Sequence, residues 1–325
     1  IKADVFADGW HVGTIAGYDR FCTAFEYTAE WIETGFSISP ISLPLRPGLF
    51  VAEKDPFSGL YGVFDDSLPD GWGRLLTDRY LKEKGVNPNE VSVLTRLCML
   101  SDNSSGILEY KPQLMQEKAS GNIDFDELCR AAENILLDLE EDPAMLDTLF
   151  REGGSSGGAR PKVYATIDGQ EWIVKFPAKA DGMDAGKKEY MMNMLAKECG
   201  IDIPEARLIP SAICPGFFAS KRFDRKDGKR IHMISLSGLL ESSHRFPVLD
   251  YSHLMKATTV LTKSGSELWK AFRLAVFNVT AGNMDDHGKN FAFLFDEDER
   301  MWELAPAYDL TKVSTYYGEQ STTVN

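Results

Sequence analysis

The chain has 325 residues, of which 43% are hydrophobic and 26% are charged, a balance typical of globular proteins. Its net charge is -14, so it lacks the basic field that attracts nucleic-acid backbones, and we expect no strong direct binding to nucleic acid. No apolar run approaches the length of about 18 residues that a membrane-spanning helix needs, and no signal peptide is recognisable, so we expect no membrane association.

The cysteines and the chain ends add two expectations. The five cysteines are odd in number, widely spread and without a CxxC pair, which argues against a disulfide framework and against a zinc site. A reducing cytoplasm is therefore the expected location. The chain begins with Ile1 rather than Met and stops after "STTVN", and we expect it to be incomplete at its C-terminus.

The first half of the chain predicts strands followed by helices. The opening stretch alternates apolar and polar residues around Asp8-Gly9, which predicts a β-hairpin meander. The segment "SLPDGWGRLLTDRYLKEKG" has a turn at Pro69-Asp70, an apolar face and a closing Gly85, which predicts one amphipathic helix. Further helix is expected between Val91 and Ser101, and "DFDELCRAAENILLDLEEDPAMLDTLF" predicts one or two helices.

The second half begins at the sharpest change of composition, the block "REGGSSGGARPK" from Arg151 to Lys162, where we place a functional boundary. A hairpin formed by "KVYATI" and "EWIVKFP", a helix at "GKKEYMMNMLAKECG" and strands at "ARLIPS" and "GFFASKRFDR" are predicted to follow. Two helices then precede a hairpin of "FAFLF" and "WELAP". The apolar positions that predict the second of these helices are Leu268, Phe272, Ala275, Val276 and Val279.

The glycine-rich block has the composition of a phosphate-binding loop. Its glycines allow backbone amides to approach an anion, and Lys162 follows on the next strand. The block has neither the GxxxxGK[ST] nor the GxGxxG spacing, so a flexible linker between domains is the alternative interpretation.

Lys175 and Glu189 have the order of a protein-kinase ion pair. Strand alternation in "EWIVKFP" puts Lys175 on the same face as Ile173, an unusual place for a solvated charge. Glu189 lies 14 residues later on a predicted helix, a separation that allows a strand lysine to pair with a helix glutamate. Taken singly, each residue is more often an ordinary surface charge.

The stretch "NMDDHGKNFAFLF" carries the chemistry expected for phosphoryl transfer, which needs a carboxylate for the acceptor hydroxyl and oxygen ligands for magnesium. Asp285 and Asn290 have the D-x-x-x-x-N spacing of kinases, whereas Asp286 does not. Asp309 follows Asn290 by 19 residues, and the intervening hairpin would bring it back beside Asn290. Turn capping is the alternative for each aspartate, and His287 is expected to hold the loop rather than to bind zinc.

These motifs together resemble a known family, the HipA-like serine/threonine kinases, which are toxins of bacterial toxin–antitoxin pairs. The resemblance covers nearly the whole chain. "SLPDGWGRLL" and "SSGILEYKP" resemble the N-terminal subdomain, "SSGGARPK" the glycine loop and "SKRFDR" the hinge. "NMDDHGKNFAFL" and "WELAPAYDL" resemble the catalytic and metal motifs, and these two are the most specific.

The resemblance implies an α+β, two-lobed protein-kinase-like fold with a β-rich N-terminal subdomain and a mainly helical C-terminal lobe. We expect a first domain at 1–112, the remainder of the N-lobe at 113–222 and the C-terminal lobe at 223–325. The second of these contains the glycine-rich loop 153–162 and the strand that carries Lys175.

The resemblance also implies roles for individual residues. Asp285 is implied as the catalytic base, Asn290 and Asp309 as magnesium ligands, and Ser155 as the loop serine that becomes phosphorylated, with Ser156 as the alternative. The hinge backbone around Lys221 and Phe223 is implied to receive the adenine. Residues implied to lie near ATP are Ser155, Gly157, Gly158, Ala159, Lys162, Lys175, Lys221, Phe223, His287 and Lys289.

The implied function is an ATP- and magnesium-dependent protein kinase that phosphorylates a translation component, an aminoacyl-tRNA synthetase being the leading class. Its implied partner is an antitoxin of HipB type with a helix-turn-helix domain, which would do the DNA binding that this acidic chain does not. Two alternatives are a catalytically inactive kinase-fold corepressor and a small-molecule phosphotransferase. The intact set of Lys175, Asp285, Asn290 and Asp309 argues against the first, and the sequence leaves the second open.

Overall fold

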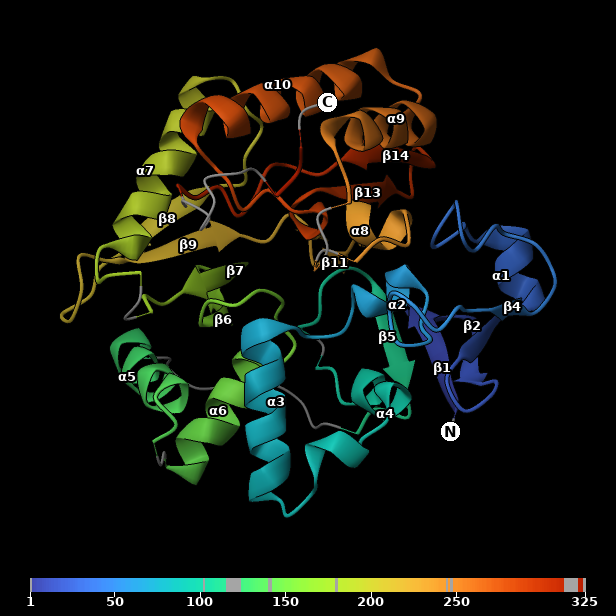
Figure 1. Cartoon of the computed structure of the whole chain (residues 1–325), viewed down its shortest axis with the longest axis horizontal. Helices are drawn as coiled ribbons and strands as arrows, with labels where there is room; N and C mark the ends of the chain where they lie inside the picture. Colours follow the sequence, from blue (N-terminus) through green and yellow to red (C-terminus); the bar gives the residue numbers. More distant parts are fainter. Residues whose placement is uncertain are drawn as a thin grey trace.

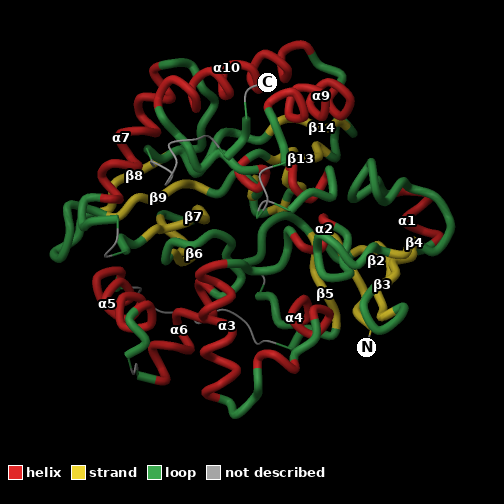
Figure 2. Tube along the Cα trace, viewed as in Figure 1, coloured by secondary structure: helices red, strands yellow, loops and turns green. Residues whose placement is uncertain are grey.

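The structure is a computed structural model that describes residues 2–101, 103–114, 124–139, 142–178, 181–243, 245, 248–312 and 321–323. In Figure 1 the N-terminal sheet lies at the lower right, and the C-terminal helices lie across the top. A second sheet lies between the helices of the middle of the chain and those of its end, as the colouring by secondary structure in Figure 2 shows.

The N-terminal region is an antiparallel five-stranded sheet in the order β4-β3-β2-β1-β5. The turn between the first two strands is Asp8-Gly9, and both residues have positive φ, 47° and 81°, as a two-residue hairpin turn of matching twist requires. The predicted meander is therefore confirmed. The strands are β1 (Lys2–Ala7), β2 (Trp10–Gly17), β3 (Thr23–Tyr27), β4 (Phe50–Val51) and β5 (Leu108–Lys111).

Helices fill the space between this sheet and the glycine-rich block. The helix predicted around Trp72 is present, and Gly85 follows it at a φ of +75°, a conformation that glycine adopts without strain. Two further helices occupy the segment for which one or two were predicted. The helices are α1 (Ala29–Thr34), α2 (Gly62–Asp65), α3 (Gly71–Glu83), α4 (Val93–Cys98), α5 (Phe125–Leu136) and α6 (Pro143–Gly153), with a 3-10 helix at Pro88–Glu90.

The glycine-rich loop is shorter than the predicted range 153–162. Gly153 is the last residue of α6, and Lys162 is the first residue of the next strand. The end of α6 lies close to the next strand, since a Cβ on Gly153 would lie 2.6 Å from the carbonyl oxygen of Lys162. Only glycine therefore fits at this last position of the helix. We use "glycine loop" below for residues 154–161.

A second antiparallel sheet follows the glycine loop, in the order β6-β7-β9-β8. Figure 1 shows α7 (Ala185–Glu198) beside β8 and β9, so a helix covers one side of this sheet. The predicted hairpin, helix and strands are all present. The strands are β6 (Lys162–Ile167), β7 (Gln170–Lys175), β8 (Ala206–Ile209) and β9 (Phe217–Lys221).

The C-terminal part combines helices with a three-stranded sheet in the order β12-β13-β14. The predicted final hairpin is β13 (Ala292–Asp296) and β14 (Met301–Leu304), and β12 (His232–Ser235) pairs with its first strand. The remaining elements are the small hairpin of β10 (Arg225–Lys226) and β11 (Lys229–Arg230), and the helices α8 (Leu236–Leu239), α9 (Tyr251–Thr262) and α10 (Gly265–Ala281). The α+β class with a β-rich N-terminal region is confirmed.

The apolar face predicted for α10 is only partly buried. Ala275 is buried as expected, but Phe272, Val276 and Val279 are exposed. The helix instead turns Leu274 and its neighbours inward, because α9 and β14 cover that side. The buried apolar residues of α10 are Ala271, Leu274, Ala275 and Phe277.

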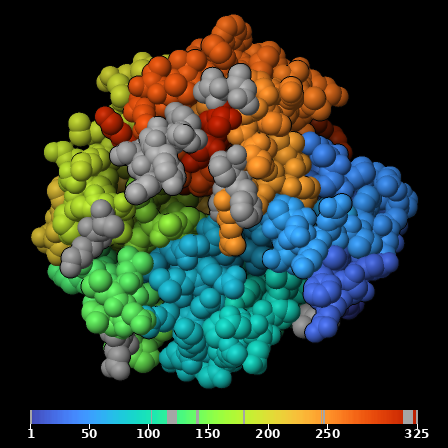
Figure 3. Space-filling view, in the orientation of Figure 1, coloured from blue at the N-terminus to red at the C-terminus, as the bar shows by residue number. Residues whose placement is uncertain are grey.

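The hydrophobic core joins segments that are distant in the sequence. One cluster contains residues of the N-terminal sheet together with residues of α9, α10 and β13, and a second contains residues of α3, α5, α6 and the β6–β9 sheet. Figure 3 shows N-terminal atoms in blue directly beside C-terminal atoms in orange on the visible face. The domain boundaries after residues 112 and 222 stay predictions. Among the described helices, none is long and apolar enough to cross a membrane.

Candidate active site

The centre of the candidate site is an ion cluster around Lys175. This lysine ends β7, and its Nζ lies 2.5 Å from Oε1 of Glu189 on α7, so the predicted ion pair is present. The same ammonium group donates to Oδ1 of Asp309, which follows β14. The side chains of Lys175 and Glu189 are 10% and 5% exposed, so this is a buried pair and not a surface contact.

The charges of this cluster stabilise one another. Burial alone would lower the pKa of Lys175, but the carboxylates of Asp309 and Glu189 outweigh it and raise that pKa above its usual value. Burial alone would likewise raise the pKa of Asp309, but Lys175 and Lys162 outweigh it and hold that pKa well below its usual range. Lysine and aspartate are therefore both charged at neutral pH.

A second lysine lies directly across the hairpin from the first. Lys162 on β6 is the register partner of Lys175 on β7, and cross-strand partners point to the same face of a sheet. Burial lowers the pKa of Lys162, although Asp309 partly opposes this effect. Two neighbouring ammonium groups repel each other, so this arrangement favours an anion between them. A polyphosphate would supply that charge.

The glycine loop bends around the Lys162 ammonium group. Its Nζ donates to the carbonyl oxygen of Gly157 at 2.6 Å. Gly158 has a φ of +86°, which a side chain would strain, and a Cβ there would lie 2.6 Å from the same Nζ, so the ammonium group would have to shift. Arg160 in this loop lies 3.8 Å from Glu189 and 3.0 Å from Asp181. The loop therefore adds one more cation to this region.

The two loop serines make different contacts. The hydroxyl of Ser155 accepts a hydrogen bond from the N–H of Ser101 at 3.0 Å and lies 3.1 Å from the Ser101 hydroxyl. The Ser156 hydroxyl donates to the carbonyl of Gly153 at 2.6 Å, within the turn itself. Ser155 is 7% exposed and Ser156 is fully buried. Ser155 is thus held by a distant segment of the chain, whereas Ser156 is bonded to the last residue of α6, three positions before it.

The catalytic-loop candidate follows α10, whose C-cap is the left-handed residue Gly282. The side chain of Asp285 is 56% exposed, whereas Asp286 is fully buried. Asp286 accepts hydrogen bonds from the Tyr251 hydroxyl and from the N–H of Thr322, the latter at 3.0 Å. Asp286 therefore braces the loop, and Asp285 is the aspartate that can reach a bound molecule.

Asn290 precedes β13 and Asp309 follows β14, so both lie at the same end of the final hairpin. The hydroxyl of Tyr308 donates to the Lys289 carbonyl at 2.6 Å, which places the residue before Asp309 against the residue before Asn290. Asn290 donates its Nδ2 to the Asp285 carbonyl at 2.5 Å, which leaves its side-chain oxygen as the atom able to bind a metal. His287 Nε2 lies 3.8 Å from Oδ1 of Asp285, in keeping with a role inside this loop.

These oxygens fit a magnesium ion that is shared with phosphates. Within the described residues, no group of three or more His, Cys, Asp or Glu side chains could hold a metal by itself. Magnesium is commonly bound by only one or two side-chain oxygens together with substrate phosphates and water. An ionised Asp309 and the Asn290 oxygen are a donor set of that kind.

The hinge lies between β9 and β10. The N–H groups of Lys221 and Arg222 donate to the carbonyls of Glu205 and Glu171, at 2.8 and 2.9 Å. In the described part of the chain, no protein group accepts a hydrogen bond from the N–H of Phe223, so this N–H is available to a ligand.

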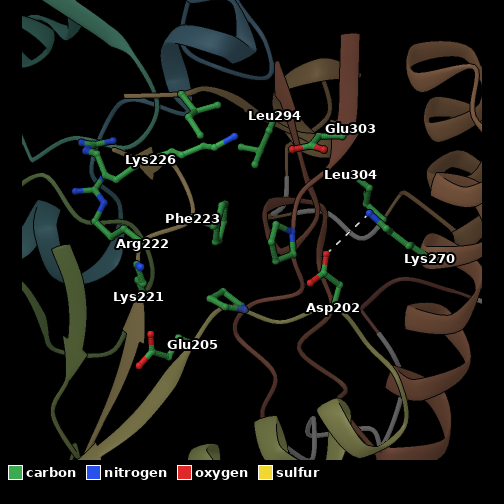
Figure 4. A pocket seen from close by; sticks show the side chains of 14 residues that line it. Asp202, Glu205, Lys221, Arg222, Phe223, Lys226, Lys270, Leu294, Glu303 and Leu304 are labelled. Atoms are coloured by element: carbon green, nitrogen blue, oxygen red, sulfur yellow. Dashed lines mark ion pairs between the residues drawn. The ribbon is translucent and has the colours of Figure 1, made fainter. Parts of the chain in front are cut away.

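A pocket of about 280 Å³ adjoins this hinge. In Figure 4 the Phe223 ring stands in the middle of the pocket, with Leu294 and Leu304 on one side and Lys221 and Glu205 on the other. The residues that line it do not include Lys162, Lys175 or Asp309. The pocket is therefore near the hinge and separate from the ion cluster.

Sequence reasoning missed two carboxylates that reach the site from the N-terminal region. Nζ of Lys289 lies 3.2 Å from Asp65 and 3.6 Å from Asp70, and its side chain is 15% exposed. Burial alone would lower the pKa of Lys289, but Asp65, Asp66 and Asp70 outweigh it and raise that pKa. Asp70 follows a proline and has the local signature of a turn residue, so no local signal indicated its distant partners.

The two-lobed fold and the buried strand lysine paired with a helix glutamate define a protein of the kinase-like class. The chain belongs to the HipA-like family. Its residues 154–325 match the HipA-like C-terminal domain, and residues 3–111 match the HipA N-terminal domain.

Individual relatives agree with this assignment. A candidate kinase of Sinorhizobium fredii, Y4dM, is 25% identical over 344 residues, covering 99% of this chain and 80% of the relative. The serine/threonine-protein kinase toxin HipA of Shewanella oneidensis is 23% identical, covering 90% of this chain and 70% of the relative. A solved Shewanella oneidensis complex of HipA, HipB and operator DNA matches the fold with a TM-score of 0.70 at 18% identity, covering 98% of this chain and 79% of that one.

Proposed function

We propose that this chain is an ATP- and magnesium-dependent protein serine/threonine kinase. The observation that carries the proposal is the contact of one buried ammonium group, Lys175, with both Glu189 and Asp309. In protein kinases the strand lysine pairs with a helix glutamate and holds the phosphates, and an aspartate after the final hairpin binds the metal. Burying two charges costs free energy, so the presence of a buried pair favours a functional role over a purely structural one.

Residues of the two lysine-bearing strands, the glycine loop and the hinge would bind ATP. Lys162 and Lys175 would hold the phosphates of ATP, and the backbone of Gly157, Gly158 and Ala159 would line them. Phosphoryl transfer needs positioning and charge stabilisation more than covalent help from the protein. The adenine would be received by the hinge, where the Phe223 N–H is the donor and the Lys221 carbonyl the acceptor.

The acceptor hydroxyl would be oriented by Asp285, the exposed member of the aspartate pair. Asp309 and Asn290 would bind magnesium, which when bound neutralises charge on the phosphates. Asn290 also fixes the Asp285 backbone through its Nδ2, so the metal ligand and the base are held in one geometry. His287 and Lys289 would complete the loop beside the phosphates.

We further propose that the kinase is the toxin of a toxin–antitoxin pair, with a HipB-type antitoxin as its partner. The name of the Shewanella relative and the HipA, HipB and operator DNA complex support this role. The net charge of -14 supports the proposal that a basic, helix-turn-helix antitoxin, and not this chain, contacts the DNA. All five cysteines lie in the described residues and are free thiols, which supports a cytoplasmic location.

The substrate we propose is a protein of translation, of the aminoacyl-tRNA synthetase class, and the regulation we propose is phosphorylation of Ser155 by the kinase itself. Both proposals rest on family resemblance. The contact of Ser155 with Ser101 adds support for the second, because a phosphate on that hydroxyl would break it.

Thermal unfolding with ATP and magnesium tests the nucleotide site. A ligand at about 100 times its dissociation constant adds roughly 2.7 kcal/mol to the folded state, which for a chain of this size corresponds to a rise of roughly 4 °C in Tm. Lys175→Ala should abolish the rise. The matched control is Lys188→Ala, because Lys188 lies on α7 with a side chain that is 67% exposed.

Transfer of labelled phosphate to protein serine or threonine then tests the activity. The wild-type chain and Lys188→Ala should transfer label, whereas Lys175→Ala should not. A magnesium-dependent ATP shift without any transfer would favour the inactive corepressor, and transfer only to small molecules would favour the phosphotransferase. No rise in Tm at millimolar ATP with magnesium would show that the proposed residues do not form a nucleotide site.

A further inference from the structure

Asp70 lies at the N-cap position of α3, but its side chain does not cap the helix. It is the N-cap residue of α3, where an aspartate normally accepts a hydrogen bond from an N–H of its own first turn. Its side chain makes no such bond. The carboxylate instead accepts from the N–H of Gly158 in the glycine loop. An N-cap aspartate that bonds to a distant loop and not to its own helix indicates a function in that loop.

The residues that follow Asp70 also hydrogen-bond to the glycine loop and pack closely against it. The N–H of Trp72 donates to the Gly158 carbonyl at 2.9 Å, so both backbone groups of Gly158 are held from the start of α3. The indole Nε1 of Trp72 donates to the Lys162 carbonyl at 3.0 Å. Gly71 has a φ of +41°, and a Cβ there would lie 2.5 Å from the Gly158 oxygen. This close approach is possible only without a side chain at Gly71.

The other carboxylate oxygen of Asp70 faces the catalytic loop. Its Oδ2 lies 3.6 Å from Nζ of Lys289, the residue next to Asn290. One carboxylate therefore touches the loop on each side of the proposed phosphate site. Asp65 also reaches Lys289, at 3.2 Å. No contact of Asp65 with the glycine loop is seen among the described residues, which makes it a matched comparison.

We propose that Asp70 is a positioning residue that holds the glycine loop closed and in register with Lys289. The inference rests on the proposed kinase function, because it assigns to this contact the placement of the phosphate-binding loop. A loop that is closed only part of the time lowers the apparent affinity for ATP by that fraction. Asp70 thus lets a segment of the HipA N-terminal domain set the closed fraction of a loop in the C-terminal domain.

Hydrogen exchange of the loop amides in the absence of ATP tests the contact. A hydrogen bond to a charged group is strong enough that its loss should speed exchange of the Gly158 amide by about 10- to 100-fold. We expect this increase in Asp70→Ala, with unchanged exchange in the core of α9. Asp70→Asn should give a smaller increase, because its amide oxygen still accepts while its charge is lost. Asp65→Asn should exchange like the wild type.

Steady-state kinetics complete the test. Asp70→Ala should raise KM for ATP by about the factor by which the closed fraction falls, and kcat at saturating ATP should fall less. Equal exchange in Asp70→Ala and wild type, or an equal increase in Asp65→Asn, would overturn the proposal, as would a kcat that falls by a larger factor than KM rises. If the wild-type chain transfers no phosphate, the kinase function fails, and the exchange comparison still decides whether Asp70 holds the loop.

Discussion

Asp285 and Asp286 are adjacent in the chain but have opposite surroundings. The side chain of Asp285 is 56% exposed beside His287, and Asp286 is fully buried against Tyr251 and Thr322. Burial raises the pKa of Asp286, and the hydrogen bonds from its neighbours oppose that effect only in part. A difference of one position thus separates a residue that can contact substrate from one that supports the loop.

We predict that Asp285→Asn and Asp286→Ala fail in different ways. Asp285→Asn should abolish phosphoryl transfer while unfolding and ATP binding remain as in the wild type, because an exposed side chain carries little packing. Asp286→Ala should lower the free energy of unfolding by about 2 to 4 kcal/mol, because it leaves the Tyr251 hydroxyl and the Thr322 N–H without their acceptor. Urea titration and a transfer assay on both variants decide the matter. Full activity in Asp285→Asn would remove it as the base.

At the scale of single elements, the glycine loop and the α2–α8 contact hold distant segments together. The loop is held by Ser101 and by the start of α3. The α2–α8 contact is made by Glu241, which follows α8 and accepts hydrogen bonds from the Gly62 N–H and the Ser42 hydroxyl. Each of these contacts contains a group whose charge state can change, by phosphorylation in the loop or by titration at Glu241.

For the loop we predict that incubation with ATP and magnesium labels Ser155 and not Ser156. The Ser155 hydroxyl is bound by a separate segment, so opening of the loop releases it, whereas the Ser156 hydroxyl stays bonded to Gly153 within its own turn. Peptide mapping by mass spectrometry should find the phosphate lost in Ser155→Ala and kept in Ser156→Ala. Lys175→Ala, which cannot transfer phosphate, is the control for chemical labelling. The reverse pattern would assign the site to Ser156.

For the α2–α8 contact we predict a pH dependence of stability. Burial raises the pKa of Glu241 from 4.5 to about 7, so the folded protein binds more protons than the unfolded chain between these values. The free energy of unfolding should therefore fall as pH rises through this window, by no more than about 3 kcal/mol from this group.

Glu241→Gln removes the titrating group and should flatten this slope, as measured by urea unfolding at pH 5 and pH 8. Ser42→Ala is the control, because it removes a donor to the carboxylate and keeps the titration. Asp66, whose pKa burial raises to about 6, adds to the same slope in all three proteins. An unchanged slope in Glu241→Gln would contradict the assignment.

At the scale of the whole molecule, a buried ionic network connects the hinge to the N-terminal region. Arg222 is 3% exposed, pairs with Asp224 at 2.6 Å and donates to the carbonyls of Asn103 and Ser104. Asp224 in turn accepts from the Gly106 N–H at 2.9 Å. The hinge that would receive adenine is thus anchored to a segment more than a hundred residues earlier in the chain.

We predict that Arg222→Ala lowers the free energy of unfolding by about 3 kcal/mol, because it removes one counter-charge of buried Asp224 and leaves the Asn103 carbonyl without its donor. The control is Arg74→Ala on α3, whose side chain is 50% exposed and pairs with Asp78 one turn later, and which should cost less than about 1 kcal/mol. Equal costs in denaturant unfolding would mean that the hinge network contributes no more than a surface pair.

Several parts of the fold could be predicted because their signals are local. The Asp8-Gly9 turn, the helix that stops before Gly85 and the hairpin after Lys162 each depend on residues within a few positions of one another. The burial of α10 was predicted less well. Its apolar residues occur on more than one face, and only the packing of α9 and β14 decides which face is covered.

The sequence by itself determined the order of the elements, the family and the spacing of Asp285, Asn290 and Asp309, because these depend on local periodicity and on motifs of fixed length. Only the tertiary structure decided that Asp70 holds Gly158 across 88 residues and that Arg222 holds Asn103 across 119. The physical reason is that such contacts form when packing of the two cores brings together segments whose local sequences carry no signal of one another.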